Sequence, residues 1–507
     1  MAALKAFFSK QNNLLINGTI IILILCLFYN SLLVHLNGNI LACFGGIFQT
    51  DFLSSFPDDV YNSWNLRGIG YKTILYFFYK LYNFLFTEWD YTLFEKFTKF
   101  TYYAILFLLS YFFLVGLKPF FKKYNFNFIR VFLCAILLFL LATHRQSMEA
   151  EEIAVIITLG MFSFSISDNK NLNMLSGLFI PILFSLKAVT IAFAGFPFIA
   201  VLFFFKDDRT KIYRFLISGV TFTLLSIVLW FIFLPGELAD LKEATNYQSS
   251  FKFKVTTIPL LVFFGVKNLS CLSNLILPYL LIVVALFVAL KSRNVRSISF
   301  IILTTILPSF YIIIQHRWFP YHYIIFLLTS FISIFYLSSV ISKTILNRVI
   351  TTGVIAACLV YFITNIVPAY KKILFIDPYC NNCNYNKTYY EEYNQKFSLM
   401  SEKYDLLSQP HILFLTSGKA SYFIKTKSYL RQTYPLSLQR VDVNPAIKKT
   451  KAYHTALNRS LNYSGDYIII DREWFNLEII HTLDDKIKAE YELVEKYDEI
   501  ELLVRNK

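Results

Sequence analysis

The chain has 507 residues, of which 56% are hydrophobic, 18% aromatic and only 16% charged. Its mean hydropathy of +0.51 lies well above the range of soluble globular proteins and is typical of a protein that crosses a membrane several times. The formal net charge of +15 does not indicate nucleic-acid binding. The lysines and arginines stand mostly in short runs between apolar segments, and no nucleic-acid-binding motif accompanies them.

The N-terminus MAALKAFFSKQNN places lysines before a long apolar run and has no small-residue cleavage site, which predicts a retained first helix and not a removed signal peptide. About eleven apolar segments approach the roughly 20 residues needed to span a bilayer. They lie near residues 14–36, 98–117, 128–143, 152–167, 173–187, 189–205, 213–234, 273–290, 298–314, 321–341 and 349–368. The sequence therefore predicts a mainly α, polytopic membrane protein.

The distribution of basic residues predicts the orientation of these segments. With the N-terminus inside, nearly every break on the cytoplasmic side is basic, as the positive-inside rule requires. These breaks are 118–123, 167–171, 206–214, 291–296 and 343–348. The outer parts are then 37–97, 144–152, the turn near Lys187, 235–272, 315–323 and a tail at 369–507. We expect a membrane domain at 1–368 and an extracytoplasmic domain at 369–507.

The segment RGIGYKTILYFFYKLYNFLF, residues 67–86, has aromatic residues at helical spacing beside Lys72 and Lys80. This composition favours a helix that lies along the membrane interface over one that crosses it.

The tail from about residue 369 changes character, because its apolar runs are shorter and its charges are mixed. HILFLTSG (411–418) and DYIIIDREW (466–474) are predicted to be buried strands, and the closing ELVEKYDEIELLVRN a strand pair. A small α/β domain results. Its CNNC motif, Cys380 to Cys383, favours a local disulfide over a redox site in an outer compartment, since no strand-to-helix setting precedes it. No second cysteine pair suggests zinc.

The first candidate for chemistry is the pair Asp58 and Asp59 in the first outer loop. A polar turn after Pro57 would explain these residues without any function. The functional hypothesis is that one of them is a general base, which accepts the proton of a sugar hydroxyl as that oxygen attacks an anomeric carbon. The other would then bind substrate or a divalent cation.

The second outer turn alternates basic and acidic groups close to the membrane. An ordinary charged turn between two helices is the simpler interpretation. A site for a phosphate-linked lipid would use cations for the phosphate and carboxylates for the sugar or a metal, because the leaving phosphate develops negative charge. The candidate residues here are His144, Arg145, Glu149, Glu151 and Glu152.

Two further outer positions offer cations. Lys187 in SLKAVTIAF either extends to the interface or contacts a phosphate. The loop QHRWFPYHY is either an aromatic belt with an interfacial arginine or part of a substrate site. Its candidate residues are His316, Arg317, Tyr321 and His322.

No phosphate-loop or dinucleotide fingerprint occurs in the sequence. A reaction on the outer face therefore needs an energy-rich substrate that has already crossed the membrane, and a polyprenyl-phosphate sugar meets this requirement.

The order of these features resembles that of the GT-C class of membrane glycosyltransferases. The features are an acidic pair in the first outer loop (Asp58, Asp59), a following interface helix with RGIGYK, an acidic second outer turn (149–152), Lys187 at the next outer turn and an outer tail domain. The segment 412–438 also resembles tail domains of bacterial members. The resemblance covers nearly the whole chain through short motifs whose order and sidedness match.

The resemblance implies inverting transfer of a sugar from a polyprenyl monophosphate to an acceptor hydroxyl, with Asp58 or Asp59 as base and with Arg67 and Lys72 near the donor. The richness in Phe, Tyr, Lys, Ile and Asn suggests an AT-rich coding sequence, which is common in horizontally acquired surface-polysaccharide genes. Together with the resemblance, this favours a bacterial inner-membrane enzyme that modifies O-antigen, lipopolysaccharide or another envelope glycan. It would work with a cytoplasmic-side donor synthase and a flippase. An O-antigen polymerase or ligase and a lipid-linked glycan transporter are the competing hypotheses.

Overall fold

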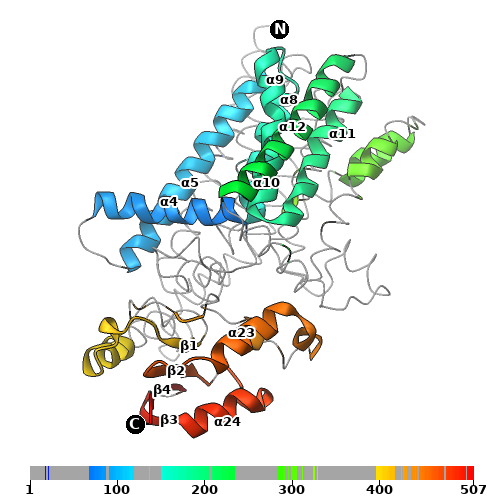
Figure 1. The fold of residues 1–507 in the computed structure, drawn as a ribbon. Coiled ribbons are helices and arrows are strands. Elements are labelled where there is room, and N and C mark those ends of the chain that lie inside the picture. The colour runs from blue at the N-terminus through cyan, green and yellow to red at the C-terminus, as the bar shows by residue number, and fades with distance from the viewer. Residues whose placement is uncertain are drawn as a thin grey trace, which may run out of the picture.

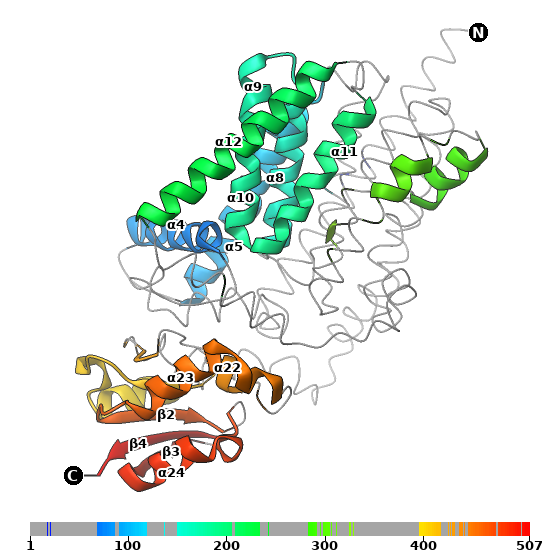
Figure 2. The same ribbon diagram turned by 45° about the vertical axis from the view of Figure 1, so that its right-hand side comes forward.

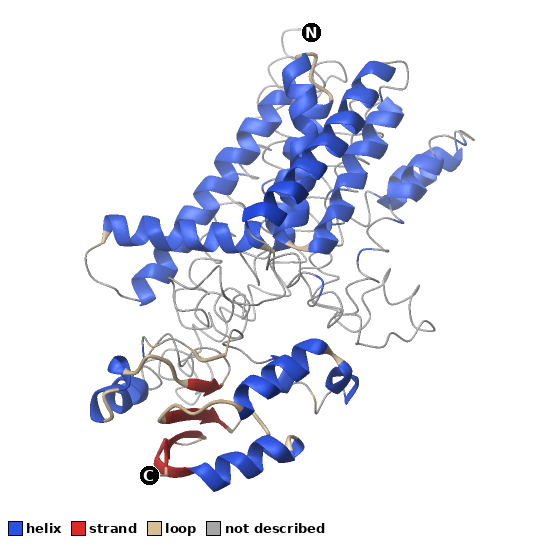
Figure 3. Cartoon of the chain, in the orientation of Figure 1, coloured by secondary structure: helices blue, strands red, loops and turns tan. Residues whose placement is uncertain are grey.

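The computed structural model describes residues 68–86, 91–118, 150–204, 208–233, 282–291, 298–304, 395–416 and most of 424–506, with isolated residues elsewhere. The described part is mainly helical, and its one sheet lies near the C-terminus (Figures 1 and 3). The sequence prediction of a mainly helical chain with a small C-terminal α/β unit is confirmed to this extent.

A helical bundle makes up the first part. Its central helix is α8, which packs against α5, α10, α11 and the 3-10 segment η3 (Figure 2). The bundle elements are α5 (Tyr91–Gly116), α8 (Ala150–Ser165), α9 (Lys170–Leu175), η2 (Ser176–Leu178), α10 (Phe179–Leu186), η3 (Ala188–Ala194), α11 (Gly195–Phe204) and α12 (Arg209–Phe233).

Small residues let the bundle helices approach closely. A Cβ atom on Gly160 of α8 would lie only 2.6 Å from the ring of Phe113 on α5. A Cβ atom on Gly116 of α5 would lie 2.2 Å from Oγ of Ser163 on α8. A side chain at Gly160 would have to displace the Phe113 ring, whereas one at Gly116 would first meet the rotatable hydroxyl of Ser163. Gly160 is therefore the stronger constraint on this close crossing.

The helix from Lys170 to Leu186 narrows to the 3-10 segment η2 in its middle. Pro181 explains this, because proline has no N–H to donate to the carbonyl of Gly177 four residues earlier. At the same place α12 comes very near, since a Cβ on Gly177 would lie 2.3 Å from the backbone nitrogen of Gly219. The narrowed turn is therefore where α12 crosses.

Helix α4 (Ile69–Leu85) lies across one end of the bundle, transverse to α5 and α8 (Figure 1). One of its faces is buried through Tyr71, Phe78 and Tyr82, whereas Phe77 and Phe84 on another face are exposed. The predicted helix at 67–86 is thus confirmed.

The other predicted spans that the structure describes are helical, with shifted ends. Helix α5 begins seven residues before the predicted 98 and α8 begins at Ala150, so both take up residues that were assigned to outer loops. The apolar core of a span is locally visible in the sequence, whereas a polar first turn still forms helix when the helix continues beyond it. The predicted turn at Lys187 lies between α10 and η3 as expected.

Among the described residues, α12 is the one helix long and apolar enough to cross a membrane by itself. Shorter apolar helices run over Phe100–Gly116, Lys170–Leu186, Ala188–Phe203 and Ile282–Lys291. The prediction of about eleven spans stays a prediction.

The C-terminal unit contains a four-stranded sheet in the order β1-β2-β4-β3. Strands β1 and β2 are parallel, and β4 is antiparallel to β2 and β3. Their bounds are β1 Leu413–Leu415, β2 Tyr467–Asp471, β3 Tyr491–Tyr497 and β4 Ile500–Arg505. These positions confirm both predicted buried strands and the predicted final strand pair.

Side chains that alternate along the strands make two cores. Leu413, Leu415, Ile468 and Ile470 pack with residues of α23 (Lys451–Leu461) and α24 (His481–Glu490). Phe414, Ile469 and Leu502 point the other way and are also buried, as the two-residue period of a strand requires. The remaining elements are η7 (Leu406–Ser408), α22 (Leu436–Gln439), η8 (Pro445–Lys449) and η9 (Leu477–Ile479). The CNNC motif and the first apolar segment, 14–36, lie outside the described ranges, apart from isolated residues of that segment.

Candidate functional site

Two adjacent carboxylates begin α8, and both are completely buried. Glu151 and Glu152 lie in the first turn of this helix and are 0% exposed. A negative charge is favourable at the positive end of the helix dipole, but a buried carboxylate needs further partners. The partners come from three other parts of the chain.

Lys187 is the cationic partner of Glu151. Its Nζ atom lies 2.7 Å from Oε1 of Glu151, and both side chains are buried. The hydroxyl of Tyr311 donates a hydrogen bond of 2.7 Å to the same oxygen. The Tyr311 ring in turn packs edge-on against Phe193 of η3. One carboxylate oxygen therefore joins α8, the α10–η3 turn and Tyr311.

Glu152 points to a different helix. Its Oε2 atom accepts a hydrogen bond of 2.9 Å from the hydroxyl of Tyr102, a buried residue of α5. Successive residues on an α-helix are about 100° apart, so the two carboxylates reach different neighbours of α8. The result is a single buried polar layer across α5, α8 and the α10–η3 turn.

The backbone around Lys187 is held by Thr190. The amide of Thr190 donates to the carbonyl of Lys187 at 2.9 Å, and its hydroxyl donates to the same oxygen at 2.8 Å. The hydroxyl also contacts the carbonyl of Leu183. These bonds satisfy carbonyls that the end of α10 leaves without helical partners, and they fix the residue that carries the ammonium group.

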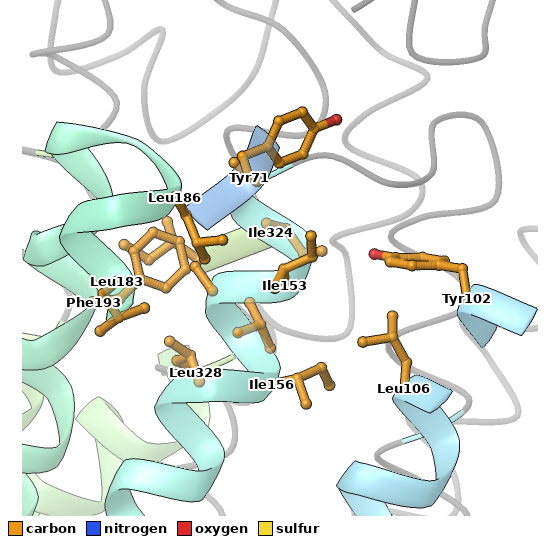
Figure 4. Close-up of a cluster of buried hydrophobic side chains, with 14 of the residues drawn as sticks. Tyr71, Tyr102, Leu106, Ile153, Ile156, Leu183, Leu186, Phe193, Ile324 and Leu328 are labelled. Carbon is orange, nitrogen blue, oxygen red and sulfur yellow. The ribbon is translucent and has the colours of Figure 1, made fainter. Parts of the chain in front are cut away.

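The surroundings of this polar layer are apolar. Figure 4 shows Tyr102 of this layer among buried side chains of α4, α5, α8 and α10, which include Tyr71, Leu106, Ile153 and Leu186. A charge pair in such surroundings is weakly screened, and removal of one partner leaves an uncompensated charge. Buried charges of this kind are also frequent in functional sites, although structural ion pairs share the feature.

Lys72 lies near the start of α4 and is 1% exposed. The N-terminus of α4 contacts the C-terminus of α10, because the amide of Gly68 donates a hydrogen bond of 3.0 Å to the carbonyl of Leu186. The structure therefore brings the start of α4 to the turn that carries Lys187, as the shared outer location of the two segments predicts.

A third buried lysine lies at the opposite end of the bundle. Lys211 at the start of α12 contacts Oδ1 of Asp168 at 2.7 Å and the carbonyl of Ile166 at 3.1 Å. Asp168 is exposed, in contrast to the fully buried Glu151. The two breaks predicted to be cytoplasmic thus meet each other, and the polar layer lies at the other end.

Most other predicted site residues lie outside the described ranges, so their roles stay predictions. No group of three or more His, Cys, Asp or Glu side chains that could hold a metal ion occurs in the described part of the chain. The predicted residues outside that part are Asp58, Asp59, Arg67, His144, Arg145, Glu149, His316, Arg317, Tyr321 and His322.

Three residues of the polar layer were not predicted from the sequence, namely Tyr102, Tyr311 and Thr190. A weak signal existed for the tyrosines, since a phenol inside an apolar span usually needs a hydrogen-bond partner. The chain contains 34 tyrosines, so that signal alone could not select these two.

The chain shows no significant match to known protein-family models, to curated proteins or to solved structures.

Proposed function

We propose that the chain is a polytopic membrane glycosyltransferase of the bacterial inner membrane. It moves a sugar from a polyprenyl-phosphate donor to a hydroxyl of an envelope glycan on the periplasmic face. The buried layer of Glu151, Lys187 and Tyr311 at one end of the helical bundle is the observation that carries this proposal.

The membrane location is supported by the exposed surface of α12. A helix of 25 residues extends about 38 Å, more than the roughly 30 Å of the hydrocarbon core. Only 17% of its apolar window is buried, whereas the core helix of a soluble protein would be mostly covered. Ile217 and Phe231 are 64% and 69% exposed. Lipid would cover these side chains, and α5 presents Leu108 and Phe112 in the same way.

The predicted orientation in the membrane is supported by the contacts between the polar segments that separate the predicted spans. The predicted inner breaks join through Lys211 and Asp168, and the predicted outer turns join through Lys187 and Glu151. Omission of the span at 173–187 from the predicted topology would have placed one member of each pair at the wrong end. With the N-terminus inside, the polar layer faces the periplasm.

The chemistry needs a base and a cation. An Asp of the first outer loop, Asp58 or Asp59, takes the proton of the acceptor hydroxyl, and the oxygen attacks the anomeric carbon from the face opposite the phosphate. The bond between the anomeric carbon and the phosphate oxygen breaks, and polyprenyl phosphate leaves with the electron pair. Lys187, already oriented by Glu151, stabilises the charge that develops on that phosphate.

A purely structural ion pair is the alternative explanation of Lys187 and Glu151. The chain offers a matched control for it, because Lys211 is also a buried lysine paired with an acid, but at the other end of the bundle. Lys187→Met and Lys211→Met each remove one such cation.

The test measures transfer of radiolabelled sugar from polyprenyl-phosphate donors to the host envelope glycan in membranes with equal amounts of each variant. Asp58→Asn or Asp59→Asn should lose about 100-fold or more. Lys187→Met should lose on the order of 100-fold, and Lys211→Met should keep transfer near the wild-type rate. No wild-type transfer with any donor, or equal loss in both lysine variants, would reject the proposal and favour a polymerase, a ligase or a transporter.

A further inference from the structure

The start of α4 touches the Lys187 turn through backbone atoms, without an intervening side chain. The amide of Gly68 donates to the carbonyl of Leu186, the residue before Lys187. The φ angle of Gly68 is −85°, which any residue adopts, so its backbone conformation does not require glycine. The lack of space requires glycine at position 68, because a Cβ atom there would lie 2.2 Å from the carbonyl oxygen of Ser185.

Gly70 provides a contrast two residues along. A Cβ at Gly70 would also come close to Ser185, but the nearest atom, at 2.1 Å, is the side-chain Oγ, and the Cβ and backbone carbonyl carbon follow at 3.0 and 3.2 Å. The hydroxyl of Ser185 can rotate or be removed by mutation. The carbonyl that opposes Gly68 is backbone and can only move together with the end of α10.

Two contacts therefore hold the backbone on either side of the Lys187 side chain. Gly68 bonds the carbonyl that precedes Lys187, and Thr190 bonds the carbonyl of Lys187 itself. Between them Lys187 has an extended backbone, with φ −167° and ψ 132°. Its ammonium group then meets Glu151 at 2.7 Å. A displacement of Ser185 and Leu186 would be passed directly to this ammonium group.

We propose that Gly68 is a positioning residue, which sets the location of the Lys187 ammonium group by direct backbone contact of α4 with the end of α10. The inference rests on the proposed transferase function and adds how its phosphate-binding cation is held. A misplacement of about 1 Å can cost a catalysed reaction on the order of 100-fold, so a methyl group at position 68 is enough to reveal the role.

The first test compares Gly68→Ala and Gly70→Ala, each alone and with Ser185→Ala. Gly68→Ala should lower kcat at least about 10-fold with little change in the donor KM, and Ser185→Ala should not restore it. Gly70→Ala should be restored by Ser185→Ala. Restoration of Gly68→Ala by Ser185→Ala, or wild-type kcat in Gly68→Ala, would overturn the proposal.

The second test asks whether Gly68 acts through Lys187. In a double-mutant cycle, Gly68→Ala should add almost nothing to the loss already caused by Lys187→Met. If Gly68 only stabilised the fold, the two losses would multiply, and the thermal unfolding midpoint of Gly68→Ala in detergent would fall in parallel with its kcat. Either of these results would overturn the positioning role.

A third measurement does not depend on activity. In Gly70→Cys with Ser185→Cys the two Cβ atoms would lie 3.0 Å apart, below the roughly 3.5–4.5 Å of a relaxed disulfide. The bond should therefore form under mild oxidation once α4 and α10 separate by about 0.5 Å, whereas neither single variant should gain a new bond. Absence of the bond would overturn the contact itself. A disulfide in a protein that transfers no sugar would instead confirm the contact and reject the transferase function, and with it the role of Gly68 in that reaction.

Discussion

Lys187 and Glu151 stand 36 residues apart in the sequence, yet Nζ and Oε1 meet at 2.7 Å inside the protein. The contact joins the first turn of α8 to the turn after α10. It converts two residues that the sequence places in separate outer turns into one buried unit.

The first prediction concerns the stability of this pair. Glu151→Gln should destabilise the protein by about 3–5 kcal/mol, because it leaves the Lys187 ammonium buried without its counter-charge. The double variant Glu151→Gln with Lys187→Met removes both charges and should regain most of that loss. Denaturant unfolding in detergent measures both variants.

Transfer activity separates the two explanations of the same pair. The double variant should stay inactive although its stability returns, because the cation for the donor phosphate is missing. Recovery of transfer together with stability would mean that the pair only holds α8 to α10.

The second prediction tests whether α12 faces lipid. Val220 is 60% exposed near the middle of this helix, where Val220→Arg should reduce membrane insertion at a cost of about 2.5–3.5 kcal/mol. Tyr213 is similarly exposed but close to the polar start of α12. Tyr213→Arg should therefore insert normally. Membrane fractionation and glycosylation-tag mapping compare the two, and normal insertion of both variants would count against a lipid-facing α12.

The third prediction concerns the crossing of α12 with the narrowed turn η2. Gly177→Ala should destabilise the protein by about 1–3 kcal/mol, because the new methyl group would meet the backbone of Ser218 and Gly219. Gly219→Ala should cost less, since its methyl group meets Cδ1 of Ile180 at 2.7 Å, the end of a flexible side chain.

Ile180→Val tells the two glycines apart, because it removes that Cδ1 atom. It should relieve Gly219→Ala and leave Gly177→Ala unchanged when unfolding midpoints in detergent are compared. Relief of both would show that side chains, and not backbone, set the distance between α12 and η2.

The fourth prediction concerns alkaline pH in the C-terminal unit. Burial raises the pKa of Tyr491 to about 12, and burial also raises the pKa of Tyr463, which stacks on it. Because these pKa values lie above the unfolded value of about 10, both phenols favour the folded state below pH 10. Their contribution is lost as the pH rises through the folded pKa values.

Tyr491→Phe should make the unit less sensitive to high pH, although it loses the hydrogen bond to the carbonyl of Gly465 at 2.9 Å and so costs about 0.5–1.5 kcal/mol at neutral pH. The difference in tyrosinate absorbance between wild type and variant during an alkaline titration reports the pKa. A titration midpoint near pH 10 for the absorbance change that Tyr491→Phe removes would contradict the prediction.

Local patterns in the sequence determined much of the secondary structure. The apolar runs gave the helices α5, α8, α10, α11 and α12, and the aromatic periodicity of 67–86 predicted α4. The same reasoning located β1, β2 and the final strand pair. These features follow from hydrophobic periodicity, which depends on neighbouring residues alone. Charge alternation also predicted that Lys187 and the acids of α8 would share one end of the bundle.

Only the tertiary structure decided how these residues are used. The sequence left open whether the second outer turn is an ordinary charged turn or a substrate site. In the structure Glu151 and Glu152 are buried in the first turn of α8, with Tyr102 and Tyr311 as partners. Which of many tyrosines meets which acid depends on helix crossings set by contacts such as Phe113 on Gly160 and α12 on Gly177. Those contacts join residues far apart in the chain, so no local pattern in the sequence contains them.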